Sequence, residues 1–298
     1  MSDRPPLFKN FSVHIVKVGA IDINCRVGGE GPPLLLLHGC PQTHVMWHKL
    51  APELAKTYTV VASDLRGYGD SSKPQGLPDH ANYAFREMAS DQLAVMKFFG
   101  FDRFYAIGHD RGARVLHRMA LDHPQALEKV CLLDILPTGL LYAQTDKNFA
   151  SRYWEWFFFI QESDFPETLL AANPLAFLRY EIGDLVDAGS ITQPAWQEYL
   201  RVLSHKDAMH GMCEDYRAGV SIDLQQDEAD SGKRIECPLL VLWATQNPIW
   251  LQFDMLDVWR GFARNVQGAA MPSGHYMAEE IPEKVLNKIL PFLGEQRP

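Results

Sequence analysis

The chain lacks the features of several protein classes. No stretch approaches the ~18 consecutive apolar residues that a membrane-spanning helix requires, and the polar start Met1–Pro6 has neither part of a signal peptide. The five cysteines are scattered without metal-ligand spacing, which is typical of free thiols in a reducing compartment. We therefore expect a soluble, cytoplasmic protein with no bound metal and no membrane partner.

Positive charge is also scarce. The 28 lysines and arginines are outnumbered by 37 aspartates and glutamates, which gives a net charge of -9. This balance argues against nucleic acid as a partner, and it opposes the approach of an anionic substrate unless local cations compensate. With 298 residues, of which 47% are hydrophobic, the chain can bury a large core, and we expect one domain with an insertion.

Short apolar runs alternate with helical periodicity along most of the chain. A leading hairpin is expected at Ser12–Val18 and Ile21–Val27, followed by buried strands at Leu34–Leu37, Thr59–Ala62, Phe104–Ile107, Val130–Leu133 and Leu239–Ala244. Helical patterns cover Phe85–Phe99, Ala113–Leu121, Asp254–Phe262 and Glu280–Leu293. The predicted fold class is α/β, with a mostly parallel central sheet and helices on both of its faces.

The strand pattern is interrupted once, between Pro137 and about Asp227. Aromatic-rich helical sequence such as Ser151–Phe159 replaces it there. This interruption predicts a helical cap inserted over the strand ends. The expected division is an α/β core at residues 1–136 and 228–298, with the cap at residues 137–227.

The strongest chemical signal is the turn Gly108-His109-Asp110-Arg111-Gly112, between an apolar strand and a helix. This context is typical of the nucleophile elbow of α/β hydrolases, but Asp110 stands where esterases carry serine. A carboxylate that attacks an acyl carbonyl makes an activated mixed anhydride, whereas attack on a tetrahedral carbon makes an ordinary ester that water can open. Asp110 therefore predicts a substrate with a saturated carbon and a leaving group.

Two further motifs supply the expected partners of this nucleophile. His38-Gly39-Cys40-Pro41 follows a strand at the point where α/β hydrolases place an oxyanion hole, so we expect the backbone N–H groups of Cys40 and Arg111 to be the donors. The order of a hydrolase triad is nucleophile, acid, histidine. His275, in the loop before the terminal helix, is therefore the expected general base.

The acid of the triad is less obvious. Thr245-Gln246-Asn247-Pro248 follows the strand after which the acid commonly lies, and it contains no carboxylate. Asp134 ends the preceding strand and is our prediction for the residue that orients His275. The alternatives are that Asp134 only caps the next segment, with Asp254 or Asp257 as the orienting residue.

Two arginines lie beside the nucleophile. Arg111 is adjacent to Asp110, and Arg114 follows four residues after it, so both guanidinium groups can converge above the carboxylate. Such a pair suggests bidentate binding of a substrate carboxylate. The alternative for either arginine is an ordinary surface ion pair.

Several runs together carry a resemblance to one known family over nearly the whole chain, cap included. The runs are Gly39–Trp47, Asp64–Gly69, the elbow with its two arginines, Leu133–Thr138 and Cys213–Gly219. They are similar to the haloacetate (fluoroacetate) dehalogenases of the α/β-hydrolase superfamily. Related epoxide hydrolases share the fold and the aspartate but usually place tryptophan after it, where this chain has Arg111.

The resemblance implies roles for individual residues. It makes Asp110, Asp134 and His275 the triad, gives the substrate carboxylate to Arg111 and Arg114, and suggests a homodimer. In this family a histidine, a tryptophan and a tyrosine of the cap hold the departing halide. Trp156 and Tyr216 match that tryptophan and tyrosine.

Glu155 stands where the family has the halide-binding histidine. An ionised carboxylate repels a halide, and only a protonated glutamate can donate a hydrogen bond to it. Fluoride is the poorest leaving group and depends most on such donors. The expected preference is therefore for chloroacetate and bromoacetate over fluoroacetate.

The predicted function is hydrolysis of a haloacetate to glycolate and halide through an Asp110 ester. No cofactor is expected, because the carboxylate is the nucleophile and the protein supplies the electrostatics. The first alternative is an epoxide hydrolase with the same aspartate, in which Tyr216 protonates the opening ring. The second is a small-molecule binding protein that keeps the hydrolase shell without turnover.

Overall fold

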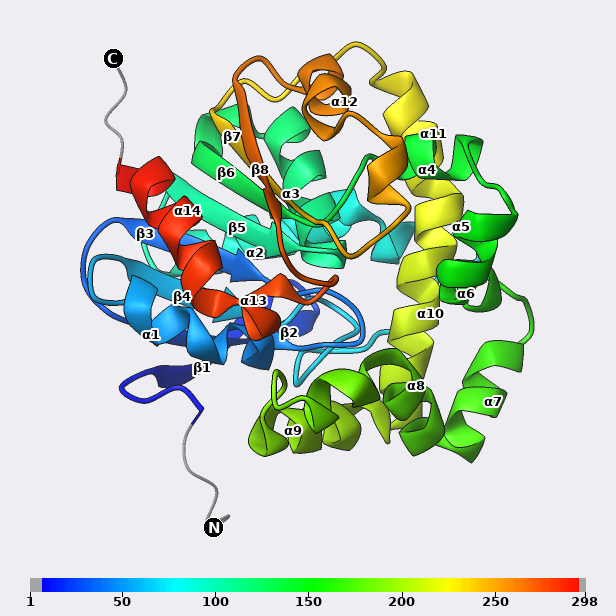
Figure 1. Ribbon diagram of the computed structural model, residues 1–298. Coiled ribbons are helices and arrows are strands. Elements are labelled where there is room, and N and C mark those ends of the chain that lie inside the picture. The colour runs from blue at the N-terminus through cyan, green and yellow to red at the C-terminus, as the bar shows by residue number, and fades with distance from the viewer. Residues whose placement is uncertain (1–6, 295–298) are drawn as a thin grey trace.

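The computed structural model describes residues 7–294, in which a central sheet of eight strands is covered by helices (Figure 1). The strand order is β1-β2-β4-β3-β5-β6-β7-β8. β1 pairs antiparallel with β2 and β2 pairs antiparallel with β4, whereas all neighbours from β4 to β8 are parallel. The strands are β1 (Ser12–Val18), β2 (Ile21–Gly28), β3 (Pro33–Leu37), β4 (Thr59–Ser63), β5 (Phe104–His109), β6 (Leu127–Leu133), β7 (Leu239–Ala244) and β8 (Val266–Met271).

Each predicted strand lies within an observed one, and the predicted fold class is confirmed. The central strands are continuous apolar runs because helices bury both faces of the sheet. The side chains from Leu34 to Leu37 in β3, for example, are fully buried. β8 was not predicted, and it differs from the central strands because it lies at the sheet edge and only Met271 in it is buried.

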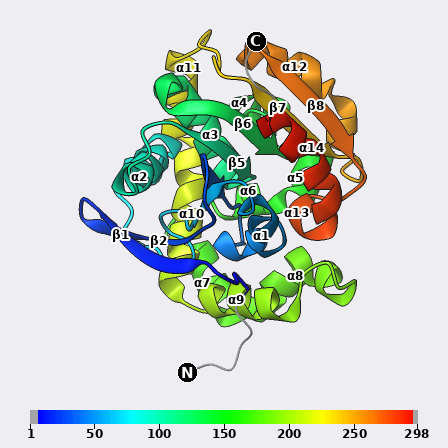
Figure 2. The same cartoon turned by 90° about the vertical axis from the view of Figure 1, so that its left-hand side faces the viewer.

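Helices of the core cover the two faces of this sheet. α2 and α3 lie on one face, and α1 and α14 lie on the other (Figures 1 and 2). The core helices are α1 (Ala51–Leu54), α2 (Phe85–Phe98), α3 (Arg111–Asp122), α12 (Met255–Phe262), α13 (Met277–Glu280) and α14 (Pro282–Gly294). The helix predicted at Glu280–Leu293 corresponds to the end of α13 together with α14.

A run of helices separates β6 from β7 in the sequence and lies beside the sheet (Figure 1). The predicted cap, residues 137–227, covers nearly all of this run, although α11 continues to Ala229. The cap helices are α4 (Thr138–Ala143), α5 (Lys147–Arg152), α6 (Trp154–Phe158), α7 (Phe165–Ala172), α8 (Pro174–Asp187), α9 (Gln193–Leu203), α10 (Lys206–Val220) and α11 (Ile222–Ala229).

The long cap helix α10 packs directly on a core loop through two glycines. A Cβ added to Gly211 would lie 2.6 Å from the Cα of Gly67, so no larger residue fits between the two backbones. Gly67 itself has a φ of +86°, which favours glycine. This close approach brings the following turn of α10, with Asp215 and Tyr216, towards the carboxyl ends of the parallel strands.

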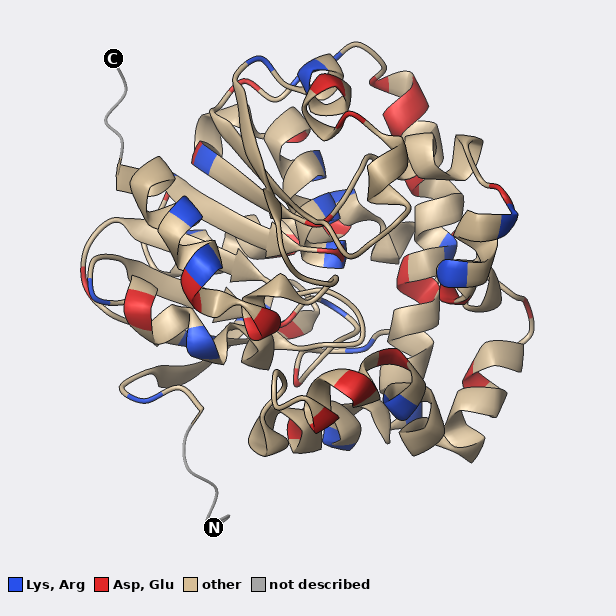
Figure 3. Cartoon of the chain, in the orientation of Figure 1, with Lys and Arg blue, Asp and Glu red and all other residues tan. Residues whose placement is uncertain are grey.

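Charged residues are distributed over core and cap alike. In the view of Figure 3, lysine and arginine positions are interspersed with aspartate and glutamate positions. Within residues 7–294, no helix combines the length and the apolar character needed to cross a membrane.

Candidate active site

The nucleophile elbow is built by glycines on either side of Asp110. Asp110 joins β5 to α3 with a φ of 46° and a ψ of -116°, a strained conformation for a residue with a side chain. A Cβ on Gly112 would lie 2.5 Å from the carbonyl oxygen of His38, and one on Gly108 would lie 2.7 Å from the backbone nitrogen of Ala113. The turn is sharp because only hydrogen fits at these positions, and it presents Asp110 at the strand ends.

The structure brings His275 and Asp134 together beside this carboxylate. His275 Nε2 lies 3.8 Å from Asp110 Oδ2, and His275 Nδ1 lies 2.6 Å from Asp134 Oδ2. The other oxygen of Asp134 accepts hydrogen bonds from the Ala244 backbone N–H at 2.6 Å and from Trp250 Nε1 at 2.7 Å. Both oxygens of this buried carboxylate are therefore engaged, and its orientation towards the imidazole is fixed.

The alternative orienting residues have another place. Asp254 is the N-cap of α12, where its side chain accepts a hydrogen bond from the backbone N–H of Asp257 at 2.9 Å. Both residues are exposed. The hydrogen bond to the imidazole thus comes from the end of β6 and not from α12.

The charges of Asp110, Asp134 and His275 determine the protonation states of the carboxylate at the elbow and of the imidazole beside it. Burial raises the pKa of Asp110, but the charges of His275 and Arg114 outweigh this effect and place the pKa below its ordinary value. Burial lowers the pKa of His275, but the hydrogen bond and charge of Asp134, with the charge of Asp110, raise it to about 9. Near neutral pH the carboxylate is therefore ionised and the imidazole protonated.

One backbone donor already points at the Asp110 carboxylate. The N–H of Cys40 donates to Asp110 Oδ1 at 3.3 Å. Gly39 permits this approach, since a Cβ there would lie 2.5 Å from the Cβ of Asp110. Arg111 is the first residue of α3, so its N–H belongs to the helix terminus that lacks intrahelical acceptors. The two predicted oxyanion-hole donors thus flank Asp110.

A cavity of about 240 Å³ opens in front of the elbow. Asp110, His275 and Cys40 lie in its wall, and the cap contributes Trp156, Tyr216 and Glu155. Its volume is below the ~300–1,000 Å³ of sites for drug-sized ligands, so a small molecule fits best. The full lining is Cys40, Pro41, Asp110, Arg152, Tyr153, Glu155, Trp156, Phe159, Phe177, Glu181, Tyr216, Gln246, Asn247, Gly274, His275 and Tyr276.

Arg111 and Arg114 lie behind this wall and not in the lining itself. The Arg111 guanidinium forms a buried ion pair with Asp215, to which its Nε donates at 2.8 Å, and it packs over the rings of Phe85 and Tyr216. The sequence analysis did not predict Asp215, because α10 is about a hundred residues from Arg111 along the chain and nothing in the local pattern marks the contact.

Arg114 is less completely paired. Its Nη1 donates to the Leu136 carbonyl at 2.9 Å and to Thr138 Oγ1 at 2.8 Å, while its buried Nε has no hydrogen-bond partner among the described residues. The guanidinium lies 4.8 Å from the ring centre of Trp156, which lines the cavity. Arg114 therefore keeps an unused donor close to the cavity wall.

Two charged residues of the cavity were not predicted. Arg152, at the end of α5, places a cation in the lining, and Glu181 on α8 adds a carboxyl to that of Glu155. Both lie in helices whose sequence patterns indicate only an amphipathic cap. Their position over the elbow depends on how α5 and α8 pack, which no local motif records.

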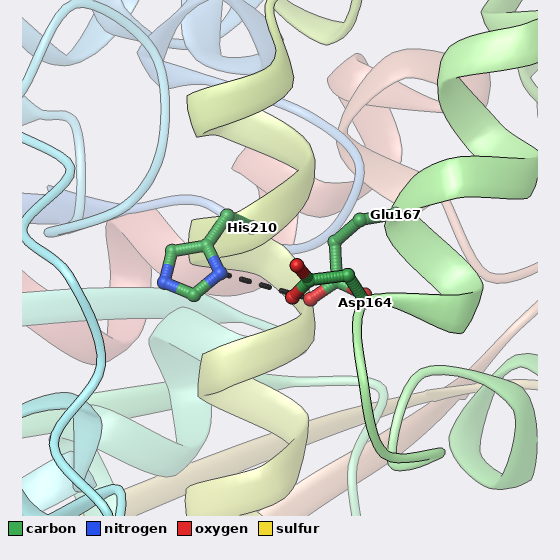
Figure 4. A group of neighbouring side chains, drawn as sticks. All are labelled: Asp164, Glu167 and His210. Carbon is green, nitrogen blue, oxygen red and sulfur yellow. Dashed lines mark ion pairs between the residues drawn. The ribbon is translucent and has the colours of Figure 1, made fainter.

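A second group of potential metal ligands lies outside this cavity. Asp164, Glu167 and His210 bring one ligand atom each within 4.8 Å of one another (Figure 4). However, Arg217 pairs with Glu167 at 2.6 Å, and His210 Nε2 accepts the backbone N–H of Gly76 at 3.1 Å. These contacts tie α7 and α10 to a core loop, so the group fastens the cap to the core.

Known proteins resemble the chain over nearly its whole length. Residues 32–280 match the family model described as alpha/beta hydrolase fold. A fluoroacetate dehalogenase from Burkholderia sp is 44% identical over 98% of this chain and 96% of that protein. A soluble epoxide hydrolase from Corynebacterium sp. (strain C12) is 29% identical over 95% of this chain and 98% of that protein. The crystal structure of ALR0039 from Nostoc sp PCC 7120 is 49% identical with a TM-score of 0.95, covering 97% of this chain and 100% of that one.

The aspartate elbow, its histidine and the cap over a small cavity are thus accompanied by similarity along the whole chain. The chain belongs to the α/β-hydrolase fold family and, within it, to the haloacetate dehalogenases.

Proposed function

We propose that the protein hydrolyses short 2-haloacids, with haloacetate giving glycolate and halide through an ester on Asp110. The observation that carries this proposal is the nucleophile itself. A buried, ionised carboxylate stands at the elbow, with a backbone donor on one oxygen and His275 Nε2 3.8 Å from the other. The 44% identity to a fluoroacetate dehalogenase supports the choice of substrate class.

In the first step Asp110 Oδ2 attacks the carbon that bears the halogen. Oδ1 stays on the Cys40 N–H, which leaves Oδ2 as the oxygen free to form the new bond. The carbon–halogen bond breaks with its electron pair on the halide, and an ester results. No base is needed in this step because the nucleophile is already ionised.

In the second step His275 activates a water that attacks the ester carbonyl. Esterification removes the negative charge of Asp110, which is one of the causes that raise the pKa of His275. The imidazole therefore loses its proton more readily in the ester than in the resting enzyme, and it becomes a base when a base is required. The Cys40 and Arg111 N–H groups stabilise the oxyanion, and glycolate leaves with the Asp110 oxygen.

The substrate carboxylate is assigned to Arg111 and Arg114. Arg114 has an unpartnered Nε near the cavity wall that can donate a hydrogen bond to the substrate. Arg111 is held by Asp215, so it contributes mainly the electrostatic attraction of its positive charge. The charges of both arginines act on Asp110, which is consistent with an anion bound above it. The halide is assigned to Trp156 and Tyr216 in the cap.

Epoxide hydrolysis is the second candidate. Tyr153 and Tyr216 both line the cavity, and their hydroxyl groups are the acids that could protonate an opening epoxide ring. The arginine pair, however, offers nothing to a neutral epoxide. The 29% identity to a soluble epoxide hydrolase keeps this reaction in the test.

The test compares halide release from fluoroacetate, chloroacetate and bromoacetate with the opening of neutral epoxides. We expect release from the haloacetates, with chloride and bromide ahead of fluoride. His275→Asn should release one equivalent of halide and then stop with Asp110 esterified. Opening of epoxides without halide release would replace the dehalogenase proposal, and rapid turnover of His275→Asn would exclude His275 as the base.

A further inference from the structure

Two carboxyl side chains of the cap face the same small cavity. Glu155 comes from α6 and Glu181 from α8. Aromatic rings of the two helices pack together, since Trp154 of α6 and Phe177 of α8 lie 6.3 Å apart between centroids. Phe177 and Glu181 are one helical turn apart and both line the cavity, so α8 presents this face to the site.

The charge of His275 opposes the effect of burial on these two carboxyls but does not outweigh it. Glu181 Oε1 is buried and has no hydrogen-bond partner among residues 7–294. Burial and the charge of Glu181 raise the pKa of Glu155, and burial raises the pKa of Glu181 against the opposing effects of His275 and a hydrogen bond from Trp154. Like charges that share a buried site do not both ionise near neutral pH.

We propose that Glu155 and Glu181 share one proton, and that Glu155 uses it to donate a hydrogen bond to the departing halide. This inference rests on the proposed function and extends it. The electron pair of the carbon–halogen bond goes to the halide, and the proton stays on Glu155 throughout. Glu181 is a positioning residue, because it acts by keeping Glu155 protonated and has no contact with substrate in this scheme.

The proposal gives the halide site a pH limit. Burial and the charge of Glu181 raise the pKa of Glu155, and above this raised pKa an ionised carboxylate faces the halide and repels it. Each further pH unit should weaken halide binding about tenfold. The other titratable or charged groups that face this part of the cavity are Cys40, Asp110, Arg152, Tyr153, Tyr216, His275 and Tyr276.

Bromide binding to the resting enzyme tests the pair without turnover. Bromide quenching of tryptophan fluorescence reports occupancy beside Trp156, with Trp156→Phe as the baseline. In the wild-type protein the bromide affinity should fall between about pH 7 and about pH 9. Glu155→Gln keeps an N–H donor at every pH, so it should bind bromide with little change over this range. Any slope left in this variant belongs to the other groups, including His275.

Glu181→Gln separates a shared proton from a merely structural role. It removes the charge that raises the pKa of Glu155, so the loss of bromide affinity should begin at lower pH than in the wild-type protein. Glu162→Gln, the same change at an exposed position outside the cavity, should leave the profile as it is. Thermal unfolding of each variant checks the fold.

Three results would overturn the pair. These are an unchanged midpoint in Glu181→Gln, a wild-type profile in Glu155→Gln, and no bromide binding at about pH 7. The outcomes also separate this inference from the proposed function. The expected bromide profiles without halide release from any haloacetate would retain the pair and reject the function, whereas halide release with a flat bromide profile would do the reverse.

Discussion

Replacing Asp134 with asparagine should stop the second half of the reaction and leave the first half intact. Asp134 Oδ1 accepts two hydrogen bonds, from Ala244 N–H and Trp250 Nε1, so this position demands an acceptor. The asparagine carbonyl oxygen therefore occupies the position of Oδ1, and the NH2 group faces His275 Nδ1. Nδ1 must then accept, the proton moves to Nε2, and the nitrogen near Asp110 can no longer act as a base.

The size of the effect follows from the charge and from the tautomer. The pKa of His275 rises from 6.5 to about 9 against the lowering effect of burial, a net change of about 3 kcal/mol in which the hydrogen bond and charge of Asp134 are the largest raising causes. Loss of this stabilisation slows a step that forms imidazolium by about 10²-fold. The reversed tautomer adds to this, and in serine triads the corresponding change costs ~10⁴-fold. We expect ester hydrolysis to slow by about 10²- to 10⁴-fold.

Rapid-quench mass spectrometry measures both steps. In Asp134→Asn we expect a burst of halide near the wild-type rate, followed by accumulation of a protein that carries the ester on Asp110. Asp254→Asn, at the exposed N-cap position of helix α12, is the matched control and should turn over normally. Ester hydrolysis at the wild-type rate in Asp134→Asn, or a loss of the burst itself, would refute this reasoning.

Three further changes test the surroundings of the site. Asp215→Asn leaves Arg111 buried and unpaired, so the free energy of unfolding should fall by ~3–5 kcal/mol. Added haloacetate should restore part of the lost melting temperature, and no such rescue would argue against carboxylate binding by Arg111. Burial raises the pKa of Glu279 to about 8, so the stability that the protonated Glu279 contributes is lost as the pH rises from 4.5 through 8. In urea titrations, Glu279→Gln should reduce this loss of unfolding free energy with pH. An equal loss in the variant and the wild-type protein would contradict the role of Glu279. Gly39→Ala places a Cβ 2.5 Å from the Asp110 Cβ, and a normal halide burst in this variant would show that the elbow tolerates displacement.

Much of the core could be predicted because its signals are local. Buried parallel strands read as continuous apolar runs, and each such run from Leu34–Leu37 to Leu239–Ala244 lies in an observed strand. β8 has no such signal. It is an edge strand whose sequence, Val266–Met271, includes glycine and two alanines and leaves most side chains partly exposed.

The site divides in the same way. Asp110, Asp134 and His275 lie at strand ends or in the loops that follow, and a parallel sheet brings such positions together at the carboxyl ends of its strands. The pairing of Arg111 with Asp215 and the approach of Glu181 to Glu155 join helices that are distant in the sequence. These contacts depend on how the cap helices pack, and neither periodicity nor a motif specifies that packing.

The most direct measurement of the central claim is a single turnover of chloroacetate in heavy-oxygen water with enzyme in excess. If Asp110 forms the ester, the water oxygen enters the Asp110 carboxyl, and the glycolate carries the ordinary oxygen that Asp110 supplied. Mass spectrometry of the peptide that contains Asp110, together with the glycolate, reads both. Label in the glycolate with none in Asp110 would contradict the covalent mechanism.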